Sequence, residues 1–308
     1  MKNKLRKNYK FILGMIFGIV ISASSVYAAT VLTSKEVSYD NTNSKLSSTN
    51  VKDAIDEVNE KATTKLEEAE KSCPEGYICT IEPLSFKNDS WTTISANVKA
   101  GKATQYKVGD TKEIDMGDLG THTVRVSNTS SCTNGETSET ACGFVVEFAD
   151  IISRKSMNST YTNVGGWPAS KMRTYVNETV YNALPNDLQN VIATTKVISA
   201  SGISETSNFA SNDKLYLLST KEVWNGGTGY DTAEAETRQL DYYKNKVVTK
   251  SNYSEAIKQY NGSNANWWLR SVSSYNTGHF WNVRDNGAWK SISPDSEYGV
   301  APAFRIAQ

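Results

Sequence analysis

The spacing of apolar residues predicts a first helix between residues 49 and 71. Apolar residues recur there at steps of roughly three and four, beginning at Val51 and Ile55, which is the period of one helical face. Thr49 or Asn50 can cap its first turn. Residues 29–48, which precede it, are rich in Ser, Thr and Asn and predict an extended stalk. The helix is therefore either a single amphipathic helix or an oligomerising element that makes a homo-oligomer through residues 49–71.

A second helix is predicted over residues 167–184. Met172, Val176, Val180 and Leu184 follow one another at steps of four, which gives the helix one apolar stripe. Pro168 fits its first turn and Pro185 ends it. The segment DLQNVIATTK, which follows directly, predicts a further short helix.

Short alternating and apolar runs predict strands in the rest of the chain. The segments are GTHTVRVSN (120–128), GFVVEFADIIS (143–153), KLYLLS (214–219), NWWLRS (266–271), HFWNVR (279–284), AWKSI (288–292) and YGVAPAFRI (298–306). Asp285-Asn286-Gly287 predicts a hairpin between two of them, because Asn-Gly supplies the positive φ that a tight turn needs. Helices and short strands together predict an α+β fold.

Composition and charge restrict the class of partner. Apolar residues make up 38% of the 308 residues and charged residues 21%, which is enough apolar material for a sizeable core. The formal net charge is zero, but five of the 33 basic residues lie within the first ten positions. Without them, 28 basic and 33 acidic side chains leave a net charge of −5. Nucleic acid is therefore not an expected partner, because its binding requires a basic surface.

The N-terminal residues have the layout of an export signal. The basic start is followed by the apolar run FILGMIFGIVI and then by SASSVYA, in which Val26 and Ala28 are small residues at the positions a signal peptidase prefers. We expect residues 1–28 to be a signal peptide and the protein to be extracellular or at the cell surface. An uncleaved N-terminal membrane anchor is the alternative, because no charge occurs between Phe11 and Ser34.

Four cysteines follow the expected cleavage site, which suits an oxidising compartment. Their positions favour two local disulfides, Cys73–Cys79 and Cys132–Cys142, although four cysteines allow three pairings. A zinc site is the alternative, but the spacings are not those of zinc ligands and His122 and His279 are the only histidines. No metal and no cofactor are expected.

Motifs of known catalytic sites are missing from the sequence. It contains no GxSxG, HExxH, P-loop or GxGxxG motif. Asp231, Glu234 and Glu236 on the loop at 226–241 are possible glycosidase carboxylates, and His279 is a possible base. Acidic loops are more often simply solvated, so the protein is not expected to be an enzyme. A secreted hydrolase is kept as an alternative.

Two resemblances to known sequences are carried by short motifs. VSYDNTNSKLSSTNVKDAIDEV resembles a segment of phage tail fibres and Gram-positive surface proteins, which implies a stalk that presents a distal domain. GGWPASKMR (165–173), NWWLRS (266–271) and GVAPAFRI (299–306) resemble an uncharacterised family of secreted domains from Gram-positive gut bacteria, over about residues 91–306. That family implies architecture and location, and it implies no activity.

The C-terminal layout also resembles, more weakly, the C-type-lectin-like fold, which includes formylglycine-generating enzymes. The matching residues are Trp268, Arg270, Val283, Arg284, Gly299, Phe304 and Arg305. The enzymes of that fold act through late cysteines, and this chain has none after Cys142. Calcium-dependent lectins carry Trp-Asn-Asp, whereas Trp281 and Asn282 are followed here by Val283. The resemblance thus implies a C-type-lectin-like α+β scaffold with a binding face.

Strand alternation separates the expected core from the expected face. Adjacent Trp267 and Trp268 cannot both point into one core from a regular strand, so a helix, a loop or a ligand must cover at least one of them. We interpret the motif tryptophans as core and Arg270 as bonded to nearby backbone. The candidate ligand-binding residues are Tyr275, Asn276, His279, Asn282, Arg284, Asn286, Trp289, Asp295 and Tyr298.

Five parts of the chain are therefore expected. They are a signal peptide (1–28), an extended stalk (29–48), a helix (49–72), a disulfide loop with linker (73–85) and a C-type-lectin-like domain (86–308). The expected function is adhesion, in which a host or bacterial surface protein or glycan binds the C-terminal aromatic-rich hairpin region. A structural protein of the envelope or of a fibre is the other alternative.

Overall fold

The computed structural model describes residues 38, 46–71, 85–132, 135–201, 207–275 and 278–306, with the side chains of 62–71 left out. The signal peptide, most of the stalk, the Cys73–Cys79 pair and Asn276 lie outside the described residues. The chain forms two units, Met1–Pro83 and Leu84–Gln308. No helix among the described residues is both long enough and apolar enough to cross a membrane.

In the first unit, α2 (Val51–Lys71) forms where the apolar spacing predicted a helix. Asn50 is its cap, since the Asn50 side-chain oxygen accepts the backbone N–H of Asp53 at 2.9 Å. The Glu57 carboxylate accepts the backbone N–H of Ser47 at 2.9 Å and that of Ser48 at 3.0 Å. These bonds fold the preceding residues back along the first turns of the helix.

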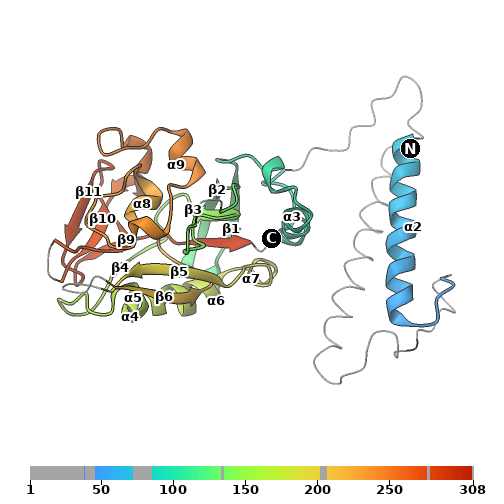
Figure 1. The fold of residues 1–308 in the computed structure, drawn as a ribbon, viewed down its shortest axis with the longest axis horizontal. Helices are drawn as coiled ribbons and strands as arrows, with labels where there is room; N and C mark the ends of the chain where they lie inside the picture. Colours follow the sequence, from blue (N-terminus) through green and yellow to red (C-terminus); the bar gives the residue numbers. More distant parts are fainter. Residues whose placement is uncertain are drawn as a thin grey trace. The chain divides into compact units, whose positions relative to one another are not determined.

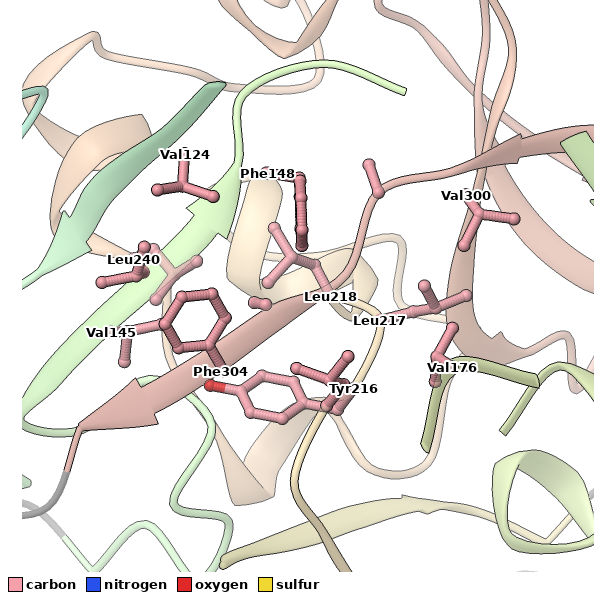
Figure 2. Packing of buried hydrophobic residues seen from close by; sticks show 14 of the residues in the cluster. Val124, Val145, Phe148, Val176, Tyr216, Leu217, Leu218, Leu240, Val300 and Phe304 are labelled. Carbon is pink, nitrogen blue, oxygen red and sulfur yellow. The ribbon is translucent and has the colours of Figure 1, made fainter. Parts of the chain in front are cut away.

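A four-stranded antiparallel sheet forms one half of the second unit. Its strands, in spatial order, are β1 (Thr111–Asp115), β2 (Thr121–Asn128), β3 (Phe144–Phe148) and β13 (Ala303–Ile306). Helix α3 (Trp91–Lys99) packs on this half, with the Trp91 and Phe304 rings 6.1 Å apart. Figure 2 shows Phe304 packed between Val145 and Tyr216 in the same core.

A five-stranded mixed sheet forms the other half. Its strands, in spatial order, are β11 (Trp289–Ile292), β10 (Phe280–Val283), β9 (Trp267–Val272), β12 (Glu297–Val300) and β4 (Ser153–Ser156). Only the β9–β12 pair is parallel. The GVAPAFRI motif joins the two halves, because its first residues lie in β12 and its last residues in β13 (Figure 1). The predicted α+β class is confirmed.

Shorter elements complete the second unit. The hairpins are β5–β6 (Thr195–Ala200, Asn208–Asp213) and β7–β8 (Lys258–Tyr260, Ser263–Ala265). The short helices are α7 (Asn186–Gln189), α8 (Thr220–Val223), α9 (Asp241–Asn245), η1 (Ala103–Gln105), η2 (Gly117–Leu119), η4 (Glu234–Glu236) and η5 (Ser254–Ala256). Figure 1 shows the β5–β6 hairpin beside the helices that follow residue 165.

The helix predicted over residues 167–184 is interrupted. It is divided into α4 (Gly166–Ala169), α5 (Lys171–Tyr175), a π-helical turn η3 (Val176–Val180) and α6 (Tyr181–Ala183). Ser170 is extended (ψ 146°) and its hydroxyl caps the next helix by accepting the N–H of Arg173 at 3.1 Å. The predicted apolar stripe is nevertheless buried, as Val176 shows in Figure 2.

Two strand predictions are corrected. Residues 143–153 supply β3 of one sheet and the start of β4 of the other, so they are two strands. Residues 214–219 form no strand beyond a single bridge between Tyr216 and Ala303. The Arg270 guanidinium donates to the Leu217 carbonyl, and the Asn177 side chain donates to the Leu215 carbonyl. The segment therefore has no continuous row of backbone groups with which a neighbouring strand could pair. The segment is apolar because it crosses the core, where Figure 2 shows Leu217 and Leu218.

The predicted hairpin between β10 and β11 is confirmed, with one difference in its turn. Gly287 has φ +87°, whereas Asn286 is not among the non-glycine residues of positive φ in the described chain. The turn closes through hydrogen bonds from Gly287 N–H to the Arg284 carbonyl (2.9 Å) and from Arg284 N–H to the Ala288 carbonyl (2.7 Å). One residue of positive φ is thus enough for this longer loop.

Gly287→Ala is expected to destabilise the second unit more than Gly226→Ala. Both glycines have φ near +85° (+87° and +83°), which costs an alanine about 1–2 kcal/mol. A Cβ at Gly287 would also lie 2.1 Å from the Tyr253 carbonyl oxygen, whereas nothing lies within 4 Å of one at Gly226. The clash adds about 1 kcal/mol or more. Urea unfolding of both variants checks this, and equal losses would contradict it.

Candidate binding face

The motif tryptophans Trp167, Trp267 and Trp268 are fully buried. Each indole N–H has a partner: the Asp213 carboxylate at 2.9 Å, the Ala256 carbonyl at 3.0 Å and the Lys155 carbonyl at 2.9 Å, respectively. The interpretation of these residues as core is confirmed. Tyr298, one of the predicted ligand-binding residues, covers Trp268 with a ring distance of 5.1 Å.

Arg270 of the same strand is buried in a polar network. Its guanidinium forms two bonds to the Glu222 carboxylate, at 2.6 and 2.5 Å, and one to the Leu217 carbonyl at 2.8 Å. The predicted backbone contact is confirmed, and the ion pair with Glu222 is an addition. Burial alone would raise the pKa of Glu222, but the charge of Arg270 outweighs it and lowers that pKa.

Ser271, the next residue, connects this network to a surface loop. The Ser271 hydroxyl accepts the N–H of Thr220 at 3.0 Å, and the Thr220 hydroxyl donates to Glu234 at 2.8 Å. Glu234 in turn accepts the backbone N–H groups of Thr228 and Gly229. The glycine-rich loop at 226–229 is therefore closed on a carboxylate that the buried network holds in place.

Tyr230, which follows this loop, belongs to a row of aromatic rings. Its carbonyl accepts both the N–H and the hydroxyl of Ser274 at 2.8 Å. The Tyr230 ring lies 5.4 Å from that of Tyr275 and 6.3 Å, nearly parallel, from that of Trp281. Trp281 meets Trp289 edge-to-face at 5.3 Å. Three separate segments thus contribute four rings in contact.

A further loop and the start of β6 join the same region. The Asn163 side chain donates to the His279 carbonyl at 3.3 Å, and the His279 and Tyr161 rings are 5.7 Å apart. Gly165 N–H donates to the Ser201 carbonyl at 3.0 Å. The Asn208 side chain donates to the Thr232 carbonyl at 3.2 Å. We call the described residues 157–165, 207–209, 226–232, 273–275 and 278–279 the loop face.

The loop face carries most of the exposed large apolar side chains of the described chain. They are Val164 (75% exposed), Tyr275 (72%), Tyr161 (56%), Tyr230 (42%) and Phe209 (38%). The one other such residue in the described chain is Val247. Single exposed apolar residues are ordinary, but a group of them on adjoining loops is typical of an interaction surface.

The predicted ligand-binding residues fall into separate places. Tyr275 and His279 lie on the loop face, and Trp289 touches it through Trp281. Arg284 and Asn286 are exposed, but they lie in the turn at the other end of β10. Asp295 is exposed beside Pro294, whose carbonyl accepts the N–H of Asn158 of the loop face at 3.0 Å.

Asn282 is buried, with its side-chain oxygen unpartnered among the described residues, so it is not accessible to a ligand in this structure. Sequence reasoning also missed Tyr161, Val164, Phe209 and Tyr230 as parts of the face. The signal that could have found them is a lone aromatic or aliphatic residue within a run of Ser, Thr, Asn and Gly, as in NSTYTN and GGTGYDT.

The carboxylates of the alternative hydrolase site are engaged by the protein itself. Glu234 holds the loop at 226–229, and the Glu236 carboxylate accepts the hydroxyl of Thr137. Asp231 is buried and accepts the N–H of Ala233 at 2.9 Å. Among the described residues, no group of three His, Cys, Asp or Glu side chains is placed to hold a metal ion.

Two ionisable groups of the loop face have shifted pKa values. Burial raises the pKa of Asp231 to about 6, against hydrogen bonds from Ser271 and from the Ala233 N–H, and Glu234 adds to the rise. Partial burial lowers the pKa of His279. Near neutral pH, His279 is therefore uncharged, while Asp231 carries a charge that its surroundings disfavour.

Asp231→Asn is expected to raise the free energy of unfolding by about 1–3 kcal/mol at about pH 7.5. Folding raises the pKa of Asp231 from 3.8 to about 6. The contribution of Asp231 to the free energy of unfolding of the wild type is therefore fully present below pH 3.8 and is lost as the pH rises through 6. The advantage of the variant should therefore disappear near pH 4. Urea unfolding at both pH values checks this, with Asp118→Asn at an exposed carboxylate as control.

The Cys132–Cys142 disulfide is present, as the spacing predicted. Its loop reaches the buried network, because the Thr140 hydroxyl donates to Glu222 and the Arg270 guanidinium donates to Thr140 at 3.1 Å. The Arg238 guanidinium bonds the carbonyls of Ala141 and Ser130, at 3.1 and 2.7 Å. The Ser138 N–H also donates to the Glu236 carbonyl at 3.0 Å, so the disulfide loop is bonded to the end of the loop at 226–236.

Comparison with known proteins bears on residues 145–308. A family profile described as "Domain of unknown function (DUF6273)" matches this range, which is just over half of the 308 residues. The range contains all segments of the loop face and the three sequence motifs. The comparisons with curated proteins and with solved structures gave no match.

Proposed function

Because the chain belongs to the DUF6273 family of domains of unknown function, its role must be sought in its own surface, and we propose that the loop face binds a partner. The partner is a protein or a glycan at the outside of the cell, and the protein is a non-enzymatic adhesion module. One observation carries the proposal: five large apolar side chains are exposed, four on loops and Phe209 at the start of β6, in segments that are hydrogen-bonded to one another.

The composition of these loops supports recognition. They consist largely of Ser, Thr, Asn, Gly and Tyr, as in MNSTYTNVG and GGTGYDT. Tyrosine offers a large, rigid contact area at a low cost in conformational entropy, which is why natural binding loops favour this mixture. The buried Arg270–Glu222 network lies beneath, so the loops are held before a partner arrives.

The rest of the chain suits presentation at a surface. The export signal expected over residues 1–28 brings the protein out of the cell. We propose that the second unit has the C-type-lectin-like scaffold and that the first presents it as a stalk. Ile55 and Val58 of α2 are partly exposed in the isolated chain, which supports homo-oligomer formation through residues 49–71.

An array of glycans and surface proteins, probed with residues 29–308, tests the proposed function. A ligand should be found, and Tyr275→Ala and Tyr230→Ala should each weaken its binding about tenfold or more. Val247→Ala is the matched control, because this valine is also exposed but belongs to no segment of the loop face. Binding that survives both tyrosine substitutions would show that the face lies elsewhere. If folded protein binds nothing, the adhesion function is wrong.

A further inference from the structure

The loop face also indicates the chemical class of the partner. We infer that the partner is a protein, which docks through an uncharged contact area of apolar and aromatic side chains. This inference rests on the proposed function, which left protein and glycan open. Three properties of the loop face carry it: the use of its amides and carboxylates, its charge, and the nature of the side chains it exposes.

The planar polar groups of the face are already bonded within it. The Asn158 side chain donates to the Thr162 carbonyl at 2.8 Å and accepts the Lys171 N–H at 3.0 Å. The Asn208 side chain donates to the Thr232 carbonyl and accepts the Thr232 hydroxyl at 2.7 Å. Asp231 likewise accepts the Ala233 N–H, and Glu234, just beyond the face, accepts the Gly229 N–H of the face.

A polyol such as a sugar is held mainly by hydrogen bonds to its hydroxyl groups, and amides and carboxylates are the side chains with most capacity for them. A sugar would have to displace the internal bonds that shape these loops, and leaving a buried polar group without a partner is unfavourable. The polar groups of the loop face therefore hold the loops in their conformation. What remains for a partner is the apolar and aromatic surface, together with hydroxyl groups such as those of exposed Ser159 and Thr160.

Few charged side chains lie on the face itself, although the ammonium of exposed Lys250 reaches its edge and donates to the Thr228 carbonyl at 3.2 Å. Apart from tyrosines, Asp231 and His279 are the ionisable side chains in the segments that define it. Asp231 is buried, and the pKa of His279 is lowered by partial burial. With one cation at its edge, such a surface offers little long-range attraction to a strongly charged partner. It fits a partner surface that is itself uncharged.

The exposed side chains include two that have no polar atom. Val164 is the most exposed large apolar residue on the face, and Phe209 lies on the neighbouring segment. A valine contributes to binding only when a partner removes it from water, in proportion to the apolar surface that is buried. Apolar side chains of another protein do this well, and the tyrosines beside them are the anchors that protein interfaces favour.

The test uses the full chain and two defined probes. A phage-displayed library of random dodecapeptides supplies apolar protein surface, and an array of neutral and acidic oligosaccharides supplies the glycan alternative. We expect the selected peptides to be uncharged and rich in aromatic and aliphatic residues. The Kd of a labelled synthetic peptide should rise about tenfold or more in Val164→Asp and in Tyr275→Ala. Val247→Asp, at the exposed valine outside the face, should leave it unchanged.

Salt provides an independent readout. The Kd should change less than about twofold between about 50 mM and about 500 mM NaCl, because screening affects only charged contacts. Charged peptides with a strong salt dependence would overturn the inference. Oligosaccharide binding that Tyr275→Ala abolishes would also overturn it but would leave the proposed function standing. If neither probe binds, or if Val164→Asp and Tyr275→Ala both leave the Kd unchanged, the inference and the proposed function fail together.

Discussion

We expect Glu147→Gln to lower the free energy of unfolding by about 3–5 kcal/mol at pH 7, the usual cost of removing one partner from a buried ion pair. Glu147 is fully buried between two cations, with Arg125 Nε at 3.0 Å and Lys258 Nζ at 2.9 Å. The Ser127 and Tyr243 hydroxyls donate to the same carboxylate, at 2.6 and 2.9 Å. The amide keeps the volume but leaves both cations without an anion.

The pH dependence of this effect has a definite sign. Burial would raise the pKa of Glu147, but Arg125 and Lys258 outweigh burial and lower the pKa from 4.5 to about 2. The stability that this carboxylate provides is therefore present above pH 4.5 and is lost as the pH falls toward 2. The difference between wild type and Glu147→Gln should shrink over that same interval.

Urea unfolding measures both effects, and Glu139→Gln is the matched control. Glu139 pairs with Arg305 at 2.9 Å, but its side chain is 45% exposed, so its loss should cost about 1 kcal/mol or less. The same chemical change is thus made at a buried and at an exposed carboxylate. Equal losses at the two positions would contradict the dominant role assigned to burial.

The second large effect is expected for Arg270→Met, again about 3–5 kcal/mol, because Glu222 would keep a buried charge without its cation. The double variant Arg270→Met/Glu222→Gln removes that charge while leaving an acceptor for the Ser219 N–H, which bonds Glu222 at 2.9 Å. It should be more stable than Arg270→Met alone by about 1 kcal/mol or more. A double variant less stable than the single one would contradict the unpaired charge as the cause.

Arg270→Met should also loosen the loop face, although Arg270 is buried beneath it. The N–H of Gly229 bonds Glu234 at 2.8 Å, and Glu234 is connected through Thr220 to the residue after Arg270. Hydrogen exchange of the peptide that covers residues 224–236 should therefore become faster in the variant. An unchanged exchange rate would show that the loop does not depend on the buried network.

Local patterns predicted the elements that local forces determine. The helix from 51 to 71, its Asn50 cap, the strand of Trp267 and Trp268 and the hairpin at Gly287 all follow from residues close together in sequence. The burial of the motif tryptophans also followed, because adjacent rings on one strand need cover on both sides.

Long-range contacts explain what the sequence patterns could not predict. The segment at 214–219 is apolar like a strand, but Arg270, more than fifty residues later, donates a hydrogen bond to the Leu217 carbonyl. That carbonyl is then not available to a neighbouring strand. The loop face likewise joins Tyr161 to His279 and Asn208 to Thr232 across long stretches of chain. Tyr275 and His279 were found because they lie in the aromatic-rich window, whereas Tyr161 and Tyr230 are isolated in polar sequence.

The position of β13 has a consequence for how the protein folds. Residues 303–306 pair with β3, about 160 residues earlier, and Phe304 fills the core beneath α3. The four-stranded sheet therefore stays incomplete until residue 306 has been synthesised, and contacts this distant in sequence form slowly. A chain that is still being synthesised therefore cannot complete this sheet before its last strand has left the ribosome.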